Sequence, residues 1–172
     1  MRPTRRHLLT AAGAFATAAV AGTAVVGAAS QVWWNQPHDS ATRHLSRDEI
    51  DFCDALADAI FPPSPDLPLR GAEAGVGRFF DTVLDGMAPF QRKMLRLGLH
   101  ALDQWPRPTH GRPFRELAGI EAIAVLDGWV HSDIAELRGL VASVYIFVAM
   151  AYTVHPDVSA VLSRQFLCGY GD

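Results

Sequence analysis

The sequence of 172 residues contains only two cysteines and none of the short motifs that mark common catalytic or cofactor sites. Cys53 and Cys168 do not form a Cys-x-x-Cys pair, which excludes zinc-ribbon and thioredoxin-type sites. The dinucleotide-binding glycine fingerprint, the Walker loop, the nucleophile elbow, the His-Glu-x-x-His zinc motif and the haem-attachment motif are all missing. We therefore expect no catalytic residue, no metal site and no cofactor in this chain.

The remaining titratable residues suggest no reaction chemistry either. The seven histidines are scattered, and no two of them stand four residues apart as helical metal ligands would. Asp51, Asp54 and Asp58 share one side of a predicted helix and could form an acid/base pair. Spacings of three and four on an exposed helix face are more typical of a solvated surface, and we expect these aspartates to face the solvent.

Positive charge is scarce outside the first residues. The whole chain carries 15 Lys and Arg against 18 Asp and Glu. Removal of Arg2, Arg5 and Arg6 would leave 12 basic and 18 acidic side chains, a net charge of −6. A surface of this sign does not favour phosphate backbones, so we expect no nucleic-acid partner.

The first residues have the pattern of an export signal. Arg5 and Arg6 are followed directly by Leu8 and Leu9, and then by a mildly apolar segment rich in Ala, Gly, Val and Thr. This order resembles a twin-arginine signal, which directs folded proteins across the membrane. The signal predicts an exported protein of the periplasm or cell envelope.

The fate of this segment has two interpretations. Small residues before positions 29 and 30 suit a signal peptidase, so residues 1–29 are predicted to be a signal peptide followed by a linker over residues 30–45. Alternatively, residues 8–32 are long enough to remain in the membrane as an anchor, with Trp33 and Trp34 at the interface.

Residues 46–172 are predicted to form a single helical domain. Ser46 and Glu49 have the spacing of a capping box, which predicts a helix from Ser46 to about Ile60. The prolines after Phe61 end it. Further helices are predicted over residues 76–87, 89–105, 120–130, 133–154 and 157–166.

Two of these helices carry informative patterns. The helix over residues 89–105 presents an apolar stripe of Phe90, Met94, Leu97 and Leu102, expected to face the core, with Arg96 on its other side. The helix over residues 133–154, with Ser132 as its expected cap, has an uncharged run of thirteen residues from Leu140 to Tyr152. A helix that is apolar all round is normally buried. We therefore predict an all-α fold: a compact bundle of about five to six helices around a central apolar helix.

The two cysteines have different predicted environments. Cys53 shares a helical face with Ile50, Ala57 and Ile60 and is expected to be a small buried hydrophobe. Cys168 lies in a glycine-rich C-terminal segment and is the better candidate for a disulfide. It could bond to Cys53 or to another chain, or it could stay free. The glycine-rich segment of residues 71–77 is expected to let a helix start close against a neighbour.

Aromatic residues beside proline-rich loops form a candidate interface with another chain. The candidates are Phe61, Pro62, Trp105, Phe114 and Tyr152. The alternative is that the segments of residues 61–69 and 105–114 are ordinary rigid loops.

Several segments in this order resemble the gluconate 2-dehydrogenase subunit 3 family. The similar segments are Leu45–Glu49, Ala55–Pro62, Gly71–Val76, Phe79–Asp81, Leu97–Asp103 and Tyr152–Val158. The resemblance implies a non-catalytic small subunit that stabilises a flavoprotein and supplies its export signal. The implied partner is a large subunit of the glucose-methanol-choline oxidoreductase type, which carries FAD. It passes electrons either to a cytochrome c subunit, which carries haem, or directly to quinone.

A second function remains open from the residues alone. An independent exported helical binding protein would use a pocket around Trp105, Trp129 and Tyr152.

Overall fold

We describe a computed structural model of the chain, which describes residues 41–165. The chain divides into two units, residues 1–37 and 38–172, and every described residue belongs to the second. The predicted export segment with Arg5 and Arg6 and the predicted disulfide residue Cys168 lie outside the described residues.

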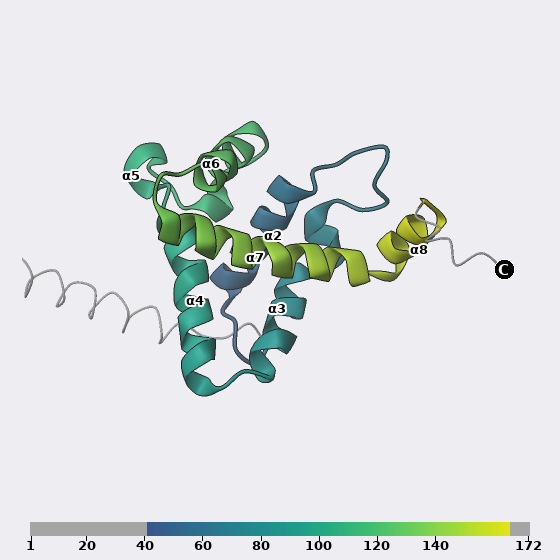
Figure 1. The fold of residues 1–172 in the computed structure, drawn as a ribbon, viewed down its shortest axis with the longest axis horizontal. Coiled ribbons are helices and arrows are strands. Elements are labelled where there is room, and N and C mark those ends of the chain that lie inside the picture. Colours follow the sequence, from purple (N-terminus) through teal and green to yellow (C-terminus); the bar gives the residue numbers. More distant parts are fainter. Residues whose placement is uncertain (1–40, 166–172) are drawn as a thin grey trace, which may run out of the picture. The chain divides into compact units, whose positions relative to one another are not determined.

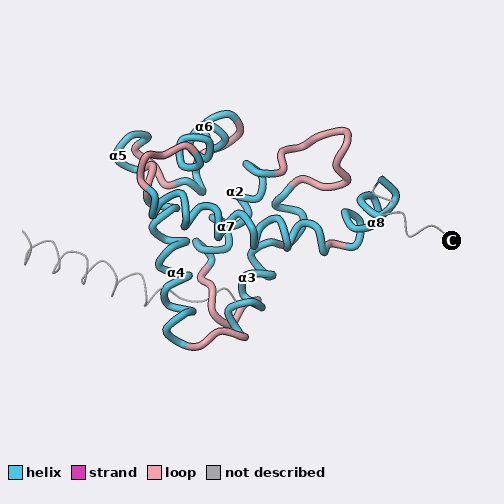
Figure 2. Tube along the Cα trace, viewed as in Figure 1, coloured by secondary structure: helices cyan, strands magenta, loops and turns pink. Residues whose placement is uncertain are grey.

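The described part of the chain consists of helices and loops. It contains six helices of ten or more residues, one single-turn helix and two short 3-10 helices, with no strand among residues 41–165 (Figures 1 and 2). In chain order these are α2 Arg47–Ile60, η1 Gly71–Ala74, α3 Val76–Asp85, α4 Pro89–Gln104, α5 Arg107–His110, η2 Phe114–Glu116, α6 Ile120–Val130, α7 Ala135–Val154 and α8 Pro156–Gln165. The predicted all-α fold is confirmed, and α6 has the predicted limits.

The capping box predicted at the start of α2 is present. The Ser46 hydroxyl accepts from the Glu49 backbone N–H at 3.4 Å, and the Glu49 carboxylate accepts from the Ser46 backbone N–H at 2.7 Å. The helix ends at Ile60, because the prolines from Pro62 onward cannot continue it. From this position α2 packs against α3, α4, α6 and both 3-10 helices.

Glycines let η1 and α3 approach α2 closely, as predicted. A Cβ atom at Gly71 would lie 2.0 Å from the Ala57 carbonyl oxygen, and one at Gly77 would lie 2.9 Å from the Ile50 side chain. Gly75 between them has φ of 68°. This left-handed conformation favours glycine and turns η1 into α3.

The long apolar helix α7 crosses α3, α4 and α6 (Figure 1). Our expectation that it is buried all round is wrong. Its buried side chains lie on one face, whereas Ile146 is 59% exposed and Val154 is 62% exposed on the other. The other helices pack on one side of α7 only, so the second side has no neighbour among the described residues. By length and composition alone, α7 could also cross a membrane.

Two local expectations near α7 and α5 differ from the structure. Ser132 does not cap α7, because its hydroxyl accepts from the Ile134 backbone N–H at 3.2 Å in a turn before the helix. The helix starts at Ala135, after Ile134. The loop predicted after Trp105 contains α5, a single turn that ends at His110 and is followed by Gly111 as its C-cap.

Candidate partner-binding surface

A buried ion pair joins α2 to α4. The Arg96 guanidinium donates to both carboxylate oxygens of Glu49, at 2.8 and 2.9 Å. The two side chains are 9% and 3% exposed. Glu49 also accepts from Ser46, so its carboxylate is engaged by the helix cap and by Arg96 at once. This carboxylate fixes the angle between two helices and has no exposed face for a substrate.

A second group of charges joins α2, α4 and η2. The Arg115 guanidinium donates to Asp103 and to Asp48, the latter at 2.9 Å, and its backbone N–H donates to Asp103 at 3.1 Å. Burial raises the pKa of the Asp103 carboxyl, while Arg115 acts in the opposite direction. Burial also lowers the pKa of the neighbouring His100. These groups are held by one another and serve the packing of three elements.

Two of the three α2 aspartates are not solvated as we expected, whereas Asp51 is 42% exposed and pairs with Arg47. Asp54 and Asp58 are half-buried and bind the backbone of the next elements. Asp58 accepts from the Ala72 N–H at 2.7 Å and pairs with Arg70, while Asp54 accepts from the Gly77 N–H. Burial raises the pKa of Asp54. Both carboxylates therefore position η1 and α3 and do not form an acid/base pair.

The segment that enters α2 is held by a single carboxylate of α3. Asp81 is 8% exposed and accepts the backbone N–H groups of Arg43, His44 and Leu45 at 2.8–3.0 Å. Three such bonds to one buried carboxylate fix this segment against α3.

Cys53 is not a reactive thiol. It is 1% exposed and unbonded, as predicted for a buried hydrophobe. Burial raises the pKa of its thiol well above the ordinary value, so the nucleophilic thiolate is not formed near neutral pH. Among the described residues, no group of three His, Cys, Asp or Glu side chains is placed to hold a metal ion.

The most unusual feature of the described residues is a set of exposed large apolar side chains on α4, α6 and α7 and the loops beside them. We call this set the apolar surface. Its members are Phe90, Met94, Leu97, Trp105, Ile120, Ile123, Val130, Ile134, Tyr145, Ile146, Met150 and Val154. No side chain of α2, α3 or α8 belongs to it. Exposed apolar residues are ordinary when scattered, but here three helices carry most of them, and α7 packs against both α4 and α6. Many large apolar side chains left exposed on packed helices are typical of a protein-binding surface.

Three of the four residues in the predicted α4 stripe face outward, contrary to our prediction, whereas Leu102 is 1% exposed, as predicted. Phe90 is 73% exposed, Met94 49% and Leu97 41%. The opposite face of the helix is buried instead, and it carries Arg96 and Leu99. The reason is that Glu49 makes Arg96 an inward-facing residue, which rotates the stripe toward the solvent.

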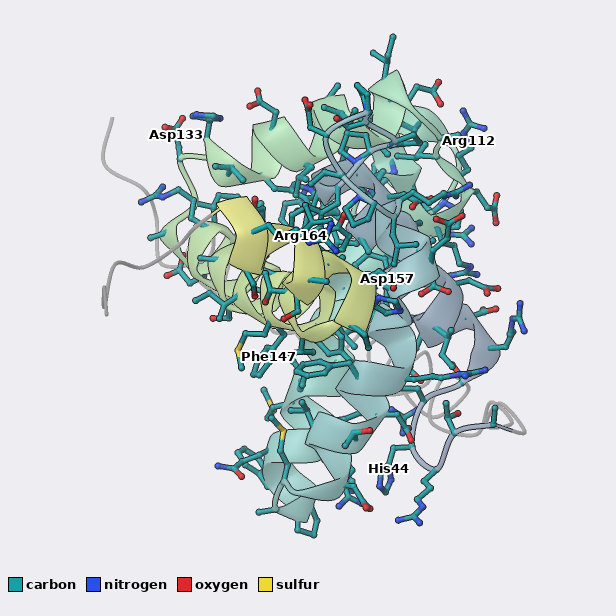
Figure 3. All side chains as sticks on the ribbon, turned by 90° about the vertical axis from the view of Figure 1, so that its right-hand side faces the viewer. His44, Arg112, Asp133, Phe147, Asp157 and Arg164 are labelled. Carbon is teal, nitrogen blue, oxygen red and sulfur yellow. The ribbon has the colours of Figure 1, made fainter. Side chains whose placement is uncertain are left out.

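The outer face of α7 carries no charge from Gly139 onward, although Glu136 and Arg138 are exposed near the start of the helix. The Ser143 hydroxyl donates to the Gly139 carbonyl at 2.8 Å, and the Thr153 hydroxyl donates to the Ala149 carbonyl at 2.9 Å. These bonds within the helix occupy the hydroxyl hydrogens of both residues. On the inner side, Phe147 points under α7 toward α3 (Figure 3), where its ring centroid lies 5.7 Å from that of Phe80. The helix is thus packed against the domain on one side, and its other side is available for an apolar contact that excludes water.

The five residues predicted at an interface fall into two classes. Trp105 is 47% exposed and Pro62 is exposed, so both are accessible. Phe114 is fully buried and Tyr152 is 2% exposed. Tyr152 stacks on half-buried Phe61, with ring centroids 4.0 Å apart. The buried rings of Phe114 and Tyr152 therefore support neighbouring residues and do not touch a partner themselves.

The structure does not assemble the pocket of the alternative binding-protein function. Trp129 stacks on Phe114 with centroids 4.9 Å apart and lines an apolar cavity with Tyr145. Neither Trp105 nor Tyr152 lines that cavity. The indole N–H of Trp129 is buried without a hydrogen-bond partner in the described part of the chain.

Several members of the apolar surface were missed by the sequence analysis. Ile146, Met150 and Val154 lie in a run that is apolar on every side, and such a run does not reveal which face will be buried. Ile120 is 84% exposed at the first position of α6. The signal available in the sequence was the uncharged run from Leu140 to Tyr152, which holds more apolar residues than one buried helix face can accommodate.

Comparison with known proteins agrees with this architecture. The family model for gluconate 2-dehydrogenase subunit 3 matches residues 47–153. The chain belongs to the gluconate 2-dehydrogenase subunit 3 family. No curated protein and no solved structure matches the chain. The family match runs from the first residue of α2 almost to the end of α7, so it includes the buried ion pairs and nearly all of the apolar surface. A family of dehydrogenase subunits is consistent with a chain whose most distinctive surface is suited to binding another chain.

Proposed function

We propose that this chain is a non-catalytic accessory subunit of an exported FAD-dependent dehydrogenase. It binds the large, flavin-carrying subunit through the apolar surface, stabilises that subunit in its folded form, and provides the twin-arginine signal for the pair. FAD belongs to the large subunit, and electrons leave it through either a haem-carrying cytochrome c subunit or quinone.

The apolar surface is the observation that carries this proposal. A chain that worked alone would gain stability by burying these side chains, whereas a subunit must keep them available. Ile146 is 59% exposed, and covering the remainder of such a side chain is worth about 1–1.5 kcal/mol. A partner that binds only the folded chain also stabilises the fold by mass action.

The first test is a mild affinity purification of the tagged full chain from its native host, with a visible spectrum of the eluate. We expect a second protein of dehydrogenase size with flavin absorption, and haem bands if a cytochrome joins. A colourless single chain, obtained under conditions that preserve complexes, would contradict the proposal.

A variant locates the contact. Ile146→Asp places a charge on an exposed position of α7, where the isolated fold tolerates it. In the complex, the charge would be desolvated against an apolar partner, so we expect affinity to fall at least about 100-fold. Thr82→Asp, on the exposed side of α3, is the matched control and should retain the flavoprotein. Retention by both variants would exclude α7 from the interface.

The export role has its own test. Changing Arg5 and Arg6 to Lys keeps the charge of the segment and removes the arginine pair. We expect both subunits to accumulate in the cytoplasm while their complex still forms. Continued export of the flavoprotein would show that another signal carries it.

A further inference from the structure

A projecting loop separates α2 from η1. It comprises residues Phe61–Arg70, which we call the proline loop, and it extends away from the helices (Figures 1 and 2). Four of its ten residues are proline, and all four are exposed: Pro62, Pro63, Pro65 and Pro68.

The two ends of the proline loop are tied together. The Gly71 backbone N–H donates to the Phe61 carbonyl at 2.9 Å. The Tyr152 hydroxyl of α7 donates to the Leu69 carbonyl at 2.6 Å, while its ring stacks on Phe61. Arg70 pairs with Asp58 of α2 at the same end. The base of the loop is therefore fixed to two helices.

The tip of the proline loop is also ordered by local bonds. The Leu67 backbone N–H donates to the Ser64 carbonyl at 3.3 Å, which closes a turn with Pro65 at its second position. The Asp66 backbone N–H donates to the Ser64 hydroxyl at 3.2 Å. The Asp66 carboxylate at the tip is exposed and forms no ion pair with the described residues.

This construction exceeds what a connection needs. Because Phe61 and Gly71 are hydrogen-bonded to each other, the chain could join α2 to η1 in far fewer residues. Prolines instead hold the longer excursion in one conformation, which lowers the entropy lost when a loop binds. A rigid exposed loop with a closed base has the properties of a preformed ligand.

We propose that the proline loop inserts into an aromatic-lined groove of the dehydrogenase subunit, with a cationic side chain of that subunit beside Asp66. Proline rings pack well on aromatic faces, and a loop that is already held in one conformation binds with little ordering cost. The exposed carboxylate at the tip requires a positive charge when water is removed. This inference rests on the proposed function and adds a second contact, which borders the apolar surface where Pro62 and Pro63 line a pocket with Ile123 of α6.

The test measures the affinity of the full chain for the flavoprotein with which it co-purifies. Asp66→Lys reverses the charge at the tip, and Pro65→Gly releases the turn. We expect each to weaken binding about tenfold or more. The matched controls are Arg78→Glu, a charge reversal on the exposed side of α3, and Pro108→Gly, at an exposed proline of α5; both should bind like the parent chain.

Stability of the isolated full chain separates binding from folding. Because the tip of the proline loop is exposed, Asp66→Lys should leave the melting temperature unchanged while the affinity falls. Parental affinity for both loop variants, with loss of binding by Ile146→Asp, would overturn this inference and leave the proposed function standing. If the parent chain itself retained no flavoprotein, the proposed function would fail first, and the two results are therefore distinguishable.

Discussion

Removal of Arg96 tests whether the buried ion pair organises the fold. The Arg96→Leu variant keeps an apolar stem on α4 but leaves the Glu49 carboxylate 3% exposed without its cation. Only the Ser46 backbone N–H would still donate to Glu49 among the contacts described above. A buried charge that loses its partner cannot regain its hydration without opening the contact between α2 and α4.

The expected magnitude follows from this geometry. Breaking a buried ion pair by removing one partner costs about 3–5 kcal/mol, because the remaining charge stays desolvated. For a helical domain of this size, each kcal/mol lowers the melting temperature by about 4 °C. We therefore expect Arg96→Leu to melt roughly 12–20 °C below the parent chain.

The assay is thermal unfolding followed by circular dichroism, with a double variant as the control. Adding Glu49→Gln removes the orphaned charge and retains a side chain that can complete the capping box with Ser46. We expect this double variant to recover more than half of the loss. A loss below about 1 kcal/mol for Arg96→Leu, or a double variant no better than the single one, would refute the reasoning.

Three further predictions concern packing, pH and the base of the proline loop. Gly71→Ala should lower the free energy of unfolding by about 1–3 kcal/mol in a denaturant titration, because its Cβ would lie 2.0 Å from the Ala57 carbonyl oxygen; an unchanged midpoint would contradict the close approach. His100 has a lowered pKa in the folded chain, so its stabilising contribution is present above its ordinary pKa of 6.5 and is lost as the pH falls. His100→Gln should make the melting temperature depend less on pH between about pH 8 and about pH 5.5. An unchanged pH dependence would show that His100 is not its source. Tyr152→Phe removes the donor to Leu69 and should cost about 1 kcal/mol and speed proteolysis of the proline loop; unchanged cleavage would show that the loop base is held without this bond.

Local patterns in the sequence predicted local structure well. The capping box of Ser46 and Glu49, the stop at the prolines after Phe61 and the limits of α6 depend on interactions within a few residues. The burial of Cys53 followed from its place on one helical face. The ordered segments that resemble a family led to the same assignment as the family match over residues 47–153.

The sequence by itself therefore determined the helices, the fold class and the family, because each is encoded by spacing along the chain. The tertiary structure alone decided which face of α4 and of α7 is buried. Arg96 became a core residue and Phe90 a surface residue because Glu49, 47 positions away from Arg96, supplies the matching charge. Likewise, α7 has an exposed face because the other helices pack on only one side of it. Contacts between distant residues determine the surface that a partner meets, and helical periodicity does not contain that information.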